Sequence, residues 1–178
     1  MRIIAGKYKG RRLELPKLYF IRPTKDKVKE AVFSSIQNEI INSVFVDLFS
    51  GTGAIGIEAL SRGAEEVYFI DNNKEAINLI KRNTIKLNEE TKYQIINGDW
   101  SRIKSFKKNS IDIIYIDPPY EKLNYHKVIK KILALEILKV DSHIIIERDR
   151  DVFLEKILSI EKTRKYGKTF IDFCKIYA

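Results

Sequence analysis

One aspartate, two prolines and a tyrosine, Asp117-Pro118-Pro119-Tyr120, follow the apolar, largely β-branched run 111–116. The run is typical of a buried strand, and the prolines end it because they lack N–H groups and fix φ. A carboxylate, a backbone carbonyl and an aromatic ring would then lie at the carboxyl end of a strand, where ligands bind in open α/β sheets. Prolines also end strands that have no such role, so the tetrapeptide alone leaves strand terminator and active site equally open.

Three further strand-like runs end in residues that suit a ligand site. The runs are 44–49, 66–70 and 93–97, and the residues at their ends are Asp47, Ser50-Gly51-Thr52-Gly53, Asp71-Asn72 and Gly98-Asp99-Trp100. Any one of these groups could be a plain turn or a helix cap. Four such groups at the ends of four successive strands predict a single ligand site at one edge of one sheet.

The glycine loop by itself fits a dinucleotide site. Gly51-Thr52-Gly53-Ala54-Ile55-Gly56 matches G-x-G-x-x-G, and Asp71, twenty residues after Gly51, is placed for a ribose hydroxyl pair. However, a dinucleotide puts its pyrophosphate at the helix N-terminus, and Asp47 would be an anion beside it. S-adenosylmethionine has no phosphate, and its ammonium and sulfonium charges favour a nearby carboxylate. Asp99 could accept from an adenine amino group, and Trp100 could flank the adenine or belong to the core.

Strands and helices alternate along most of the chain. Besides the four strands above, we expect strands at 143–146, 160–166 and 169–177, the last two as an antiparallel hairpin, and helices at 25–41, 54–62, 73–87, 128–135 and 152–158, with a short helix after Trp100. Thr24 is expected to cap the first helix, whose lysines should face solvent. This order predicts a doubly wound, mostly parallel α/β sheet.

The N-terminal residues are expected to form a separate extension. Strands at 2–5 and 11–15 predict a β-hairpin, so residues 1–23 form the extension and residues 24–178 the main domain.

Positive charge is concentrated at the N-terminus. Residues 1–30 hold ten Lys and Arg against three acidic residues, which is seven of the nine net positive charges of the 178-residue chain. A basic segment on a nearly neutral body is typical of a polyanion-binding surface, and nucleic acid is favoured over a merely solvated surface. The residues expected to contact RNA are Lys7, Tyr8, Lys9, Arg11, Arg12 and Arg22, with Tyr8 exposed at the hairpin tip to stack on bases.

Other functional classes find little support. Cys174 is the only cysteine, so neither a disulfide framework nor a zinc cluster is expected. No apolar run approaches the ~20 residues that a membrane helix requires, and the first residues lack a signal-peptide core. We therefore expect a cytoplasmic protein without metal or membrane association.

The chain resembles the small class I methyltransferases that use S-adenosylmethionine, and most closely the bacterial family that methylates a guanine N2 in 16S ribosomal RNA (the RsmD family). The resemblance covers nearly the whole chain and rests on Arg2-Ile3-Ile4-Ala5-Gly6-Lys7-Tyr8-Lys9-Gly10-Arg11, Arg22-Pro23-Thr24, Asp47-Leu48-Phe49-Ser50-Gly51-Thr52-Gly53, Glu58-Ala59-Leu60-Ser61-Arg62-Gly63-Ala64 and Asp117-Pro118-Pro119-Tyr120. Ser50 stands where family members often have alanine. The resemblance implies a Rossmann-like seven-stranded sheet with an antiparallel last strand, and suggests that Thr24 reaches the methionine end of the cofactor.

The resemblance also implies the activity. Asp117, Pro118, Pro119 and Tyr120 would be catalytic, and Thr24, Asp47, Ser50, Gly51, Thr52, Gly53, Asp71, Asn72, Asp99 and Trp100 would bind S-adenosylmethionine. The substrate would be 16S ribosomal RNA or the assembling 30S subunit, with the enzyme a monomer. The tetrapeptide also occurs in enzymes that methylate adenine N6 or cytosine N4 of DNA or RNA, which remain an alternative. So does a non-catalytic RNA-binding protein on the same scaffold.

Overall fold

The computed structural model of the chain describes residues 1–16, 26–85, 87, 91–118, 124–149, 152, 154 and 156–177. Its strands are β1 (Val44–Leu48), β2 (Glu66–Asp71), β3 (Lys92–Asn97), β4 (Ile111–Ile116), β5 (Leu138–Arg148), β6 (Ser159–Tyr166) and β7 (Thr169–Lys175). The helices are α1 (Asp26–Ser35), α2 (Ala54–Ser61), α3 (Lys74–Thr84), the 3₁₀ helix η1 (Trp100–Ser105) and α4 (Tyr125–Ala134). The predicted alternation of strand and helix is confirmed.

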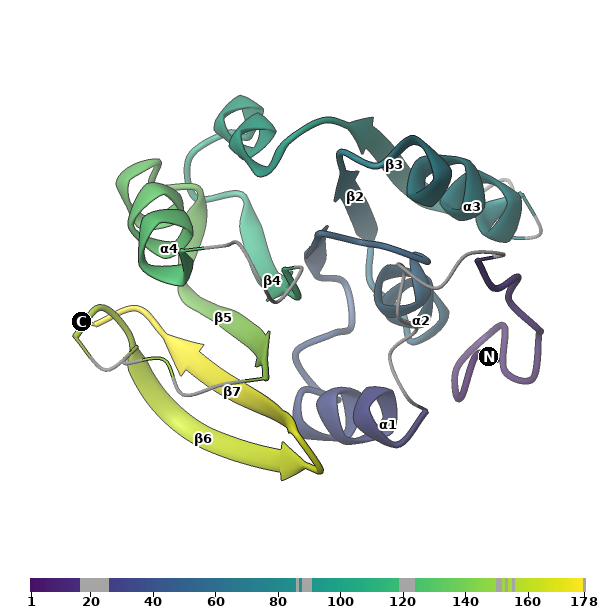
Figure 1. The fold of residues 1–178 in the computed structure, drawn as a ribbon, viewed down its shortest axis with the longest axis horizontal. Coiled ribbons are helices and arrows are strands. Elements are labelled where there is room, and N and C mark those ends of the chain that lie inside the picture. The colour runs from purple at the N-terminus through teal and green to yellow at the C-terminus, as the bar shows by residue number, and fades with distance from the viewer. Residues whose placement is uncertain are drawn as a thin grey trace.

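The seven strands form one sheet in the order β3-β2-β1-β4-β5-β7-β6 (Figure 1). The first five strands in this order are parallel, and β7 runs antiparallel to both β5 and β6. Helices cover both faces of the sheet, since each parallel connection must cross over it. The doubly wound, mostly parallel sheet with a C-terminal antiparallel hairpin is therefore confirmed.

Each face of the sheet has its own apolar core. On one face, α1 and α2 pack with the N-terminal segment over Phe45, Ile113 and Ile145. On the other face, η1 and α4 pack over Ile114 and Ile146. The alternation of Ile113 with Ile114 and of Ile145 with Ile146 follows the two-residue period of a strand that is buried on both sides.

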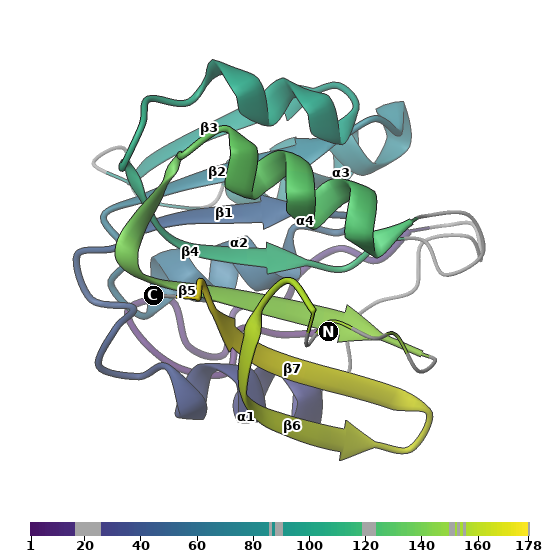
Figure 2. The same cartoon turned by 90° about the vertical axis from the view of Figure 1, so that its left-hand side faces the viewer.

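The parallel strands place their carboxyl ends at one edge of the sheet. In Figure 2 the arrowheads of β1, β4 and β5 all point to the right, and this edge faces the viewer in Figure 1. Because β6 is antiparallel to β7, which is antiparallel to β5, the C-terminal end of β6 lies at the same edge.

Several element boundaries differ from the prediction. The first helix ends at Ser35 instead of residue 41, and residues 36–42 form turns that finish at Asn42 in the left-handed region. Ser and Asn favour such turns because their side chains compete for backbone hydrogen bonds. Strand β5 begins at Leu138, five residues before the predicted start. In the described part of 152–158 there is a turn at 156–158 and no helix, so that helix prediction is wrong there.

The N-terminal segment reverses as predicted but is not a regular hairpin. Its strands are reduced to one antiparallel bridge between Arg2 and Arg12, because the amides of Ile4 and Ala5 donate to the Glu58 carboxylate of α2 rather than to a second strand. The apolar side chains of this segment belong to the core over α1 and α2. The predicted boundary of the extension at residue 23 lies outside the described residues.

Candidate active site

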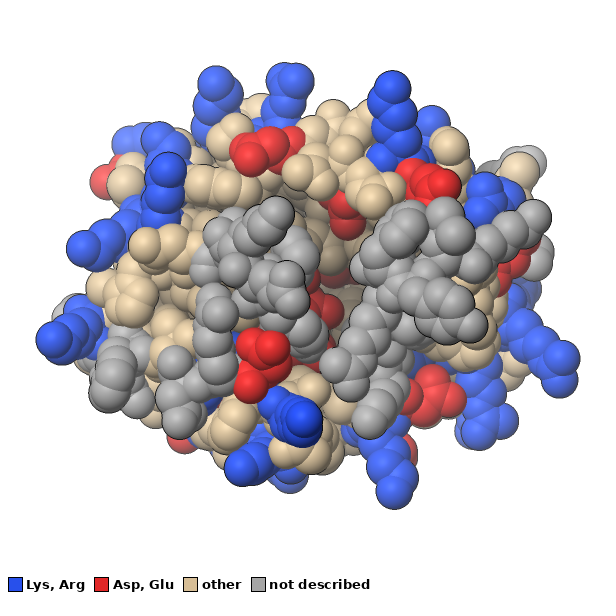
Figure 3. All heavy atoms as spheres, in the orientation of Figure 1, with Lys and Arg blue, Asp and Glu red and all other residues tan. Residues whose placement is uncertain are grey.

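The carboxyl ends of four neighbouring strands lie level with one another. Leu48 of β1 is in register with Ile70 of β2 and Ile116 of β4, and Ile70 is in register with Ile96 of β3. The structure therefore places at one edge the four predicted carboxylates, Asp47, Asp71, Asp99 and Asp117. Figure 3 looks onto this edge, where acidic side chains are visible within a central hollow.

The glycine loop after β1 is tied to both β1 and β2. The Ser50 hydroxyl donates to the Asp47 carbonyl at 2.6 Å, and the Gly51 amide donates to Asp71 Oδ2 at 2.8 Å. The other carboxylate oxygen of Asp71 accepts from the Asn73 amide, also at 2.8 Å. Since each carboxylate oxygen can accept more than one hydrogen bond, Asp71 can hold the loop and still accept from a ligand hydroxyl.

Three residues of this loop adopt left-handed backbone conformations. Gly51 has φ 53° and Gly53 has φ 74°, and a Cβ on Gly53 would lie 3.0 Å from the Ile80 side chain. Phe49 also has φ 65°, which is uncommon for a residue with a large side chain. Such strain concentrates at ligand sites. The sequence shows the need for the glycines, but it contains no signal for the conformation of Phe49.

Gly56 brings α2 into close contact with the sheet. A Cβ at this position would lie 2.3 Å from Cε1 of Phe69, so a larger residue would push the helix away. The close approach lets the Gly56 amide donate to Asp47 Oδ2 at 3.0 Å. Asp47 is 2% exposed, and burial, with a smaller contribution from Asp71, raises its pKa to about 8 despite that hydrogen bond.

The remaining predicted cofactor residues differ in exposure. Asp99 is exposed and caps η1 by accepting from the Ser101 amide at 2.6 Å, and Asn72 is exposed. Trp100 is half-buried and packs against the core beneath η1. Of its two predicted roles, flanking the adenine or belonging to the core, this contact fits the second. Thr52 is buried, and Thr24 lies outside the described residues.

Asp117 directly follows β4, as predicted. Its amide lies 3.4 Å from the Leu48 carbonyl, which continues the β1–β4 pairing by one residue, and its side chain is half-buried. Pro118 is buried. Pro119 and Tyr120 lie outside the described residues.

A buried hydrogen bond lies between β4 and β5 close to this motif. The Tyr115 hydroxyl donates to Glu147 Oε2 at 2.5 Å, and the Tyr125 hydroxyl donates to the Glu147 carbonyl at 3.3 Å. Burial, and then the charges of Glu147, Asp117 and Asp47, hold the pKa of Tyr115 well above its ordinary value. Tyr115 therefore remains a protonated donor. This pair could not be predicted, because nothing in the sequence shows how the two strands align.

Tyr8 does not occupy the position predicted for it. Its ring is 3% exposed, its amide donates to the Ser61 hydroxyl at 3.0 Å, and its own hydroxyl lies 2.7 Å from Thr91 Oγ1. Arg11 covers the ring, with its guanidinium 4.7 Å from the ring centroid. The prediction that Tyr8 is exposed to stack on RNA bases is therefore wrong.

The N-terminal cations are spread along the segment. Lys7, Lys9, Arg11 and Arg12 are exposed, and Arg22 lies outside the described residues. The tip packs beside Ser61 at the C-terminal end of α2, because the Lys7 amide donates to the Ser61 carbonyl at 2.7 Å. Since α2 starts at the glycine loop and runs away from it, Lys7 and Lys9 lie away from the carboxyl edge of the sheet.

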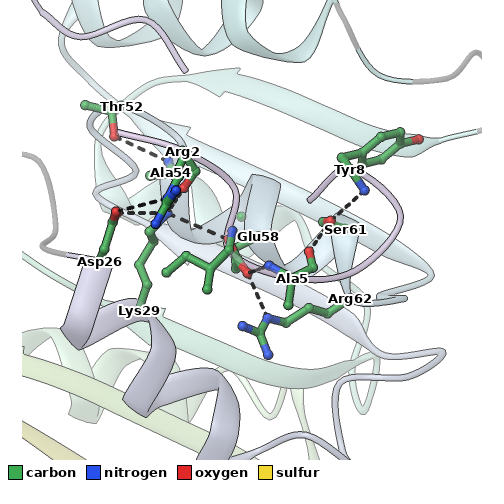
Figure 4. A network of polar contacts seen from close by, with 12 residues as sticks. Arg2, Ala5, Tyr8, Asp26, Lys29, Thr52, Ala54, Glu58, Ser61 and Arg62 are labelled. Atoms are coloured by element: carbon green, nitrogen blue, oxygen red, sulfur yellow. Dashed lines mark hydrogen bonds and ion pairs between the residues drawn. The ribbon is translucent and has the colours of Figure 1, made fainter. Parts of the chain in front are cut away.

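A buried ionic network joins the N-terminal segment to α1 and α2 (Figure 4). Glu58 is fully buried and accepts from Ile4, Ala5 and Arg62. Lys29 is fully buried too, with Nζ 2.6 Å from the Arg2 carbonyl and 3.7 Å from Glu58. The prediction that the lysines of the first helix face solvent is therefore wrong for Lys29. The Ile4 and Ala5 amides require a hydrogen-bond acceptor, which the Glu58 carboxylate provides. Because that carboxylate is buried, a cation such as Lys29 must balance its charge.

Comparisons with known proteins agree with this arrangement. The family model described as Conserved hypothetical protein 95 matches residues 1–175. The Bacillus subtilis protein YlbH is 37% identical over 182 residues, covering 98% of both chains. The ribosomal RNA small subunit methyltransferase D of Haemophilus influenzae is 32% identical over 154 residues, covering 85% of this chain and 80% of that protein.

A solved structure extends the agreement to three dimensions. The structure of Escherichia coli yhhF superposes with a TM-score of 0.87 at 25% identity, covering 100% of this chain and 98% of that one. The matches in sequence and in structure both run over nearly the full chain, including the N-terminal segment and the C-terminal hairpin. The chain therefore belongs to the ribosomal RNA small subunit methyltransferase D family, with the Rossmann-like fold of class I S-adenosylmethionine-dependent methyltransferases.

Proposed function

We propose that this protein transfers a methyl group from S-adenosylmethionine to the exocyclic N2 amine of a guanine in 16S ribosomal RNA. The observation that carries the proposal is the position of Asp117. It follows β4 one residue beyond the level of Leu48, where β1 ends and the glycine loop begins, so a carboxylate suited to an amine lies beside the predicted cofactor site. Family membership supports ribosomal RNA as the substrate class.

The chemistry of the loop fits this cofactor better than a dinucleotide. Asp47 is a buried carboxyl at the N-terminal end of α2, where a dinucleotide would need to place phosphates. A bound cation favours the ionised form of Asp47 despite its burial, whereas a phosphate disfavours that form further. S-adenosylmethionine supplies a methyl group on a positively charged sulfur, together with an ammonium group. Asp71 would accept from the ribose hydroxyls and Asp99 from the adenine.

The reacting amine needs assistance from Asp117. An exocyclic guanine amine is a weak nucleophile because its lone pair is delocalised into the ring. The Asp117 carboxylate and the Pro118 carbonyl would accept its two hydrogens and orient the lone pair toward the methyl group. As positive charge grows on the nitrogen, Asp117 stabilises it and then accepts the released proton. The guanine must leave its stack to reach this edge, and Tyr120 is proposed to stack on it.

A labelled-methyl transfer assay tests the proposed function. The purified protein and S-adenosylmethionine are incubated with naked 16S RNA, with 30S particles and with DNA, and the modified nucleotide is then mapped. We expect label in 16S RNA, free or assembled, at the N2 amine of one guanine. Label only on adenine N6 or cytosine N4 would establish the alternative amino methyltransferase. No label on any substrate, combined with tight RNA binding, would establish a non-catalytic RNA-binding protein.

A further inference from the structure

The C-terminal hairpin of β6 and β7 is basic, and the proposed function assigns no role to it. Its exposed cations are Lys162, Arg164 and Lys165 of β6 and Lys168 of the turn. In the described part of the chain none of these four side chains forms an ion pair. Elsewhere, exposed lysines such as Lys92 and Lys139 lie beside acidic partners. Among the described residues, these cations of the hairpin therefore have no acidic partner.

The cations lie level with the proposed catalytic residue. Ile116 is in register with Ile146, the next residue Glu147 pairs with Ile171, and Ile171 pairs with Arg164. Arg164 is thus at the height of Asp117, across three strand spacings, which is on the order of 14–15 Å at about 4.8 Å per spacing. The turn at Gly167 and Lys168 extends beyond this level, toward the viewer of Figure 3.

Positive charge is present on both faces of the hairpin. Arg164 pairs with Ile171, which belongs to the core under α1 and α2. Lys165 pairs with Phe170, which in turn pairs with Arg148 on the opposite face. A ribbon with cations on both sides can contact phosphate groups that pass along either side of it.

Buried contacts hold the hairpin rigidly. The Arg148 guanidinium forms two bonds to the fully buried Asp172, at 2.5 and 3.2 Å, and the Thr163 hydroxyl donates to the same carboxylate at 2.6 Å. The Phe170 ring lies between Arg148, 4.6 Å from the centroid, and Lys165 at 4.9 Å. Because Lys165 is already placed by the ring, less conformational entropy is lost when it binds a phosphate.

We propose that the β6–β7 hairpin is an RNA-binding surface that contacts phosphates flanking the guanine presented to Asp117. This surface deepens the proposed function and rests on it for the identity of the RNA. The N-terminal tip lies beside the C-terminal end of α2, whereas the hairpin borders the carboxyl edge where the reaction is placed. Arg164 and Asp117 are separated by roughly 14–15 Å at about 4.8 Å per strand spacing, so one continuous RNA segment can reach both.

The test compares two triple variants with the same change in charge. One carries Arg164→Gln, Lys165→Gln and Lys168→Gln. The control carries Lys81→Gln, Lys130→Gln and Lys131→Gln, which are exposed on α3 and α4 and have no ion pair in the described residues. Filter binding of labelled 16S RNA across a salt series measures affinity, calorimetry with S-adenosylhomocysteine measures the cofactor site, and thermal melting checks folding.

We expect the hairpin variant to lose about 10- to 100-fold in RNA affinity, with a salt dependence shallower by about two to three phosphate contacts. The control should change less than about 3-fold, and S-adenosylhomocysteine affinity should be unchanged in both variants. Equal RNA affinity of the two variants would overturn the proposed surface even if the wild-type protein methylates RNA. The opposite result is also distinguishable. If only the hairpin variant loses RNA affinity but the wild-type protein methylates no RNA, the hairpin is an RNA-binding surface and the proposed function is wrong.

Discussion

The Tyr115 hydroxyl donates to the Glu147 carboxylate at 2.5 Å, across neighbouring strands and two residues before Asp117. Both side chains are buried, so water cannot replace either one as a hydrogen-bond partner. The pair lies on the same sheet face as Asp47, which is in register with Tyr115. It therefore fixes β4 against β5 at the point where the chain leaves the sheet toward the proposed catalytic residues.

Tyr115→Phe should destabilise the protein by about 1–3 kcal/mol, because it removes a hydrogen-bond donor from a buried carboxylate. Urea unfolding followed by circular dichroism measures the change. Tyr93→Phe is the matched control, since Tyr93 is half-buried and its hydroxyl has no hydrogen bond in the described residues. That variant should stay within about 0.5 kcal/mol of wild type. Equal stability of the two variants would show that the Tyr115–Glu147 bond contributes nothing net.

Asp117→Ala should retain cofactor binding but lose at least ~10²-fold in the rate of methyl transfer, as loss of one transition-state contact typically does. Single-turnover transfer to 16S RNA measures the rate, and titration with S-adenosylhomocysteine measures binding. Asp112→Ala is a control on the same strand, because Asp112 lies at the opposite end of β4, where it accepts from the Val44 amide. A near-normal rate for Asp117→Ala would exclude the role proposed for this residue.

The buried carboxyl of Asp47 should make stability depend on pH. Its pKa is about 8 in the folded protein, against 3.8 ordinarily, so the folded state keeps a proton that the unfolded state has released. Stability should therefore fall as pH rises from about 4 to 8 and then level off. Asp47→Asn keeps an oxygen for the Gly56 amide and should remove much of this fall. At pH 9 the variant should be more stable than wild type, by no more than about 6 kcal/mol.

Cofactor binding should reverse the effect of burial on Asp47. A cation near the carboxylate lowers its pKa, so binding near pH 7 should release a proton. Calorimetric titration with S-adenosylmethionine in two buffers of different ionisation enthalpy detects that proton as a buffer-dependent heat. In Asp47→Asn the buffer dependence should disappear and the affinity should fall. Identical heats in both buffers for the wild type would show that Asp47 does not change its protonation on binding.

The edge of the sheet could be predicted because its residues are local. Gly51, Gly53 and Asp71 stand at the ends of apolar runs, and the order of strands and helices determines that such ends meet. What could not be predicted depends on contacts between distant segments. Tyr8 contacts Ser61 and Thr91, which are 53 and 83 residues away in the sequence. The local pattern around Tyr8 predicted an exposed loop tip because it contains no information on these contacts.

The same limit applies to the N-terminal segment as a whole. Ile3, Tyr8 and Leu13 are buried in the core over α1 and α2. Deleting residues 1–20 to test RNA binding would therefore also remove part of that core. Single substitutions of the exposed Lys9 or Arg12 by Gln test the predicted RNA contacts without this effect.

Glu58→Gln should destabilise the protein by about 3–5 kcal/mol, because the buried Lys29 would lose the buried carboxylate beside it and keep only the half-exposed Asp26, 3.8 Å away. Burial already lowers the pKa of Lys29, and the Glu58 charge opposes that shift. The double variant Lys29→Met and Glu58→Gln removes both charges and should recover part of the loss. Urea unfolding of this double variant and of the two single variants, Glu58→Gln and Lys29→Met, measures the coupling. Glu14→Gln, which breaks the exposed pair with Arg82, should cost less than about 1 kcal/mol. If the double variant were as unstable as the sum of the single ones, the two charges would not be coupled, and the bonds that Glu58 accepts from Ile4, Ala5 and Arg62 would account for its role.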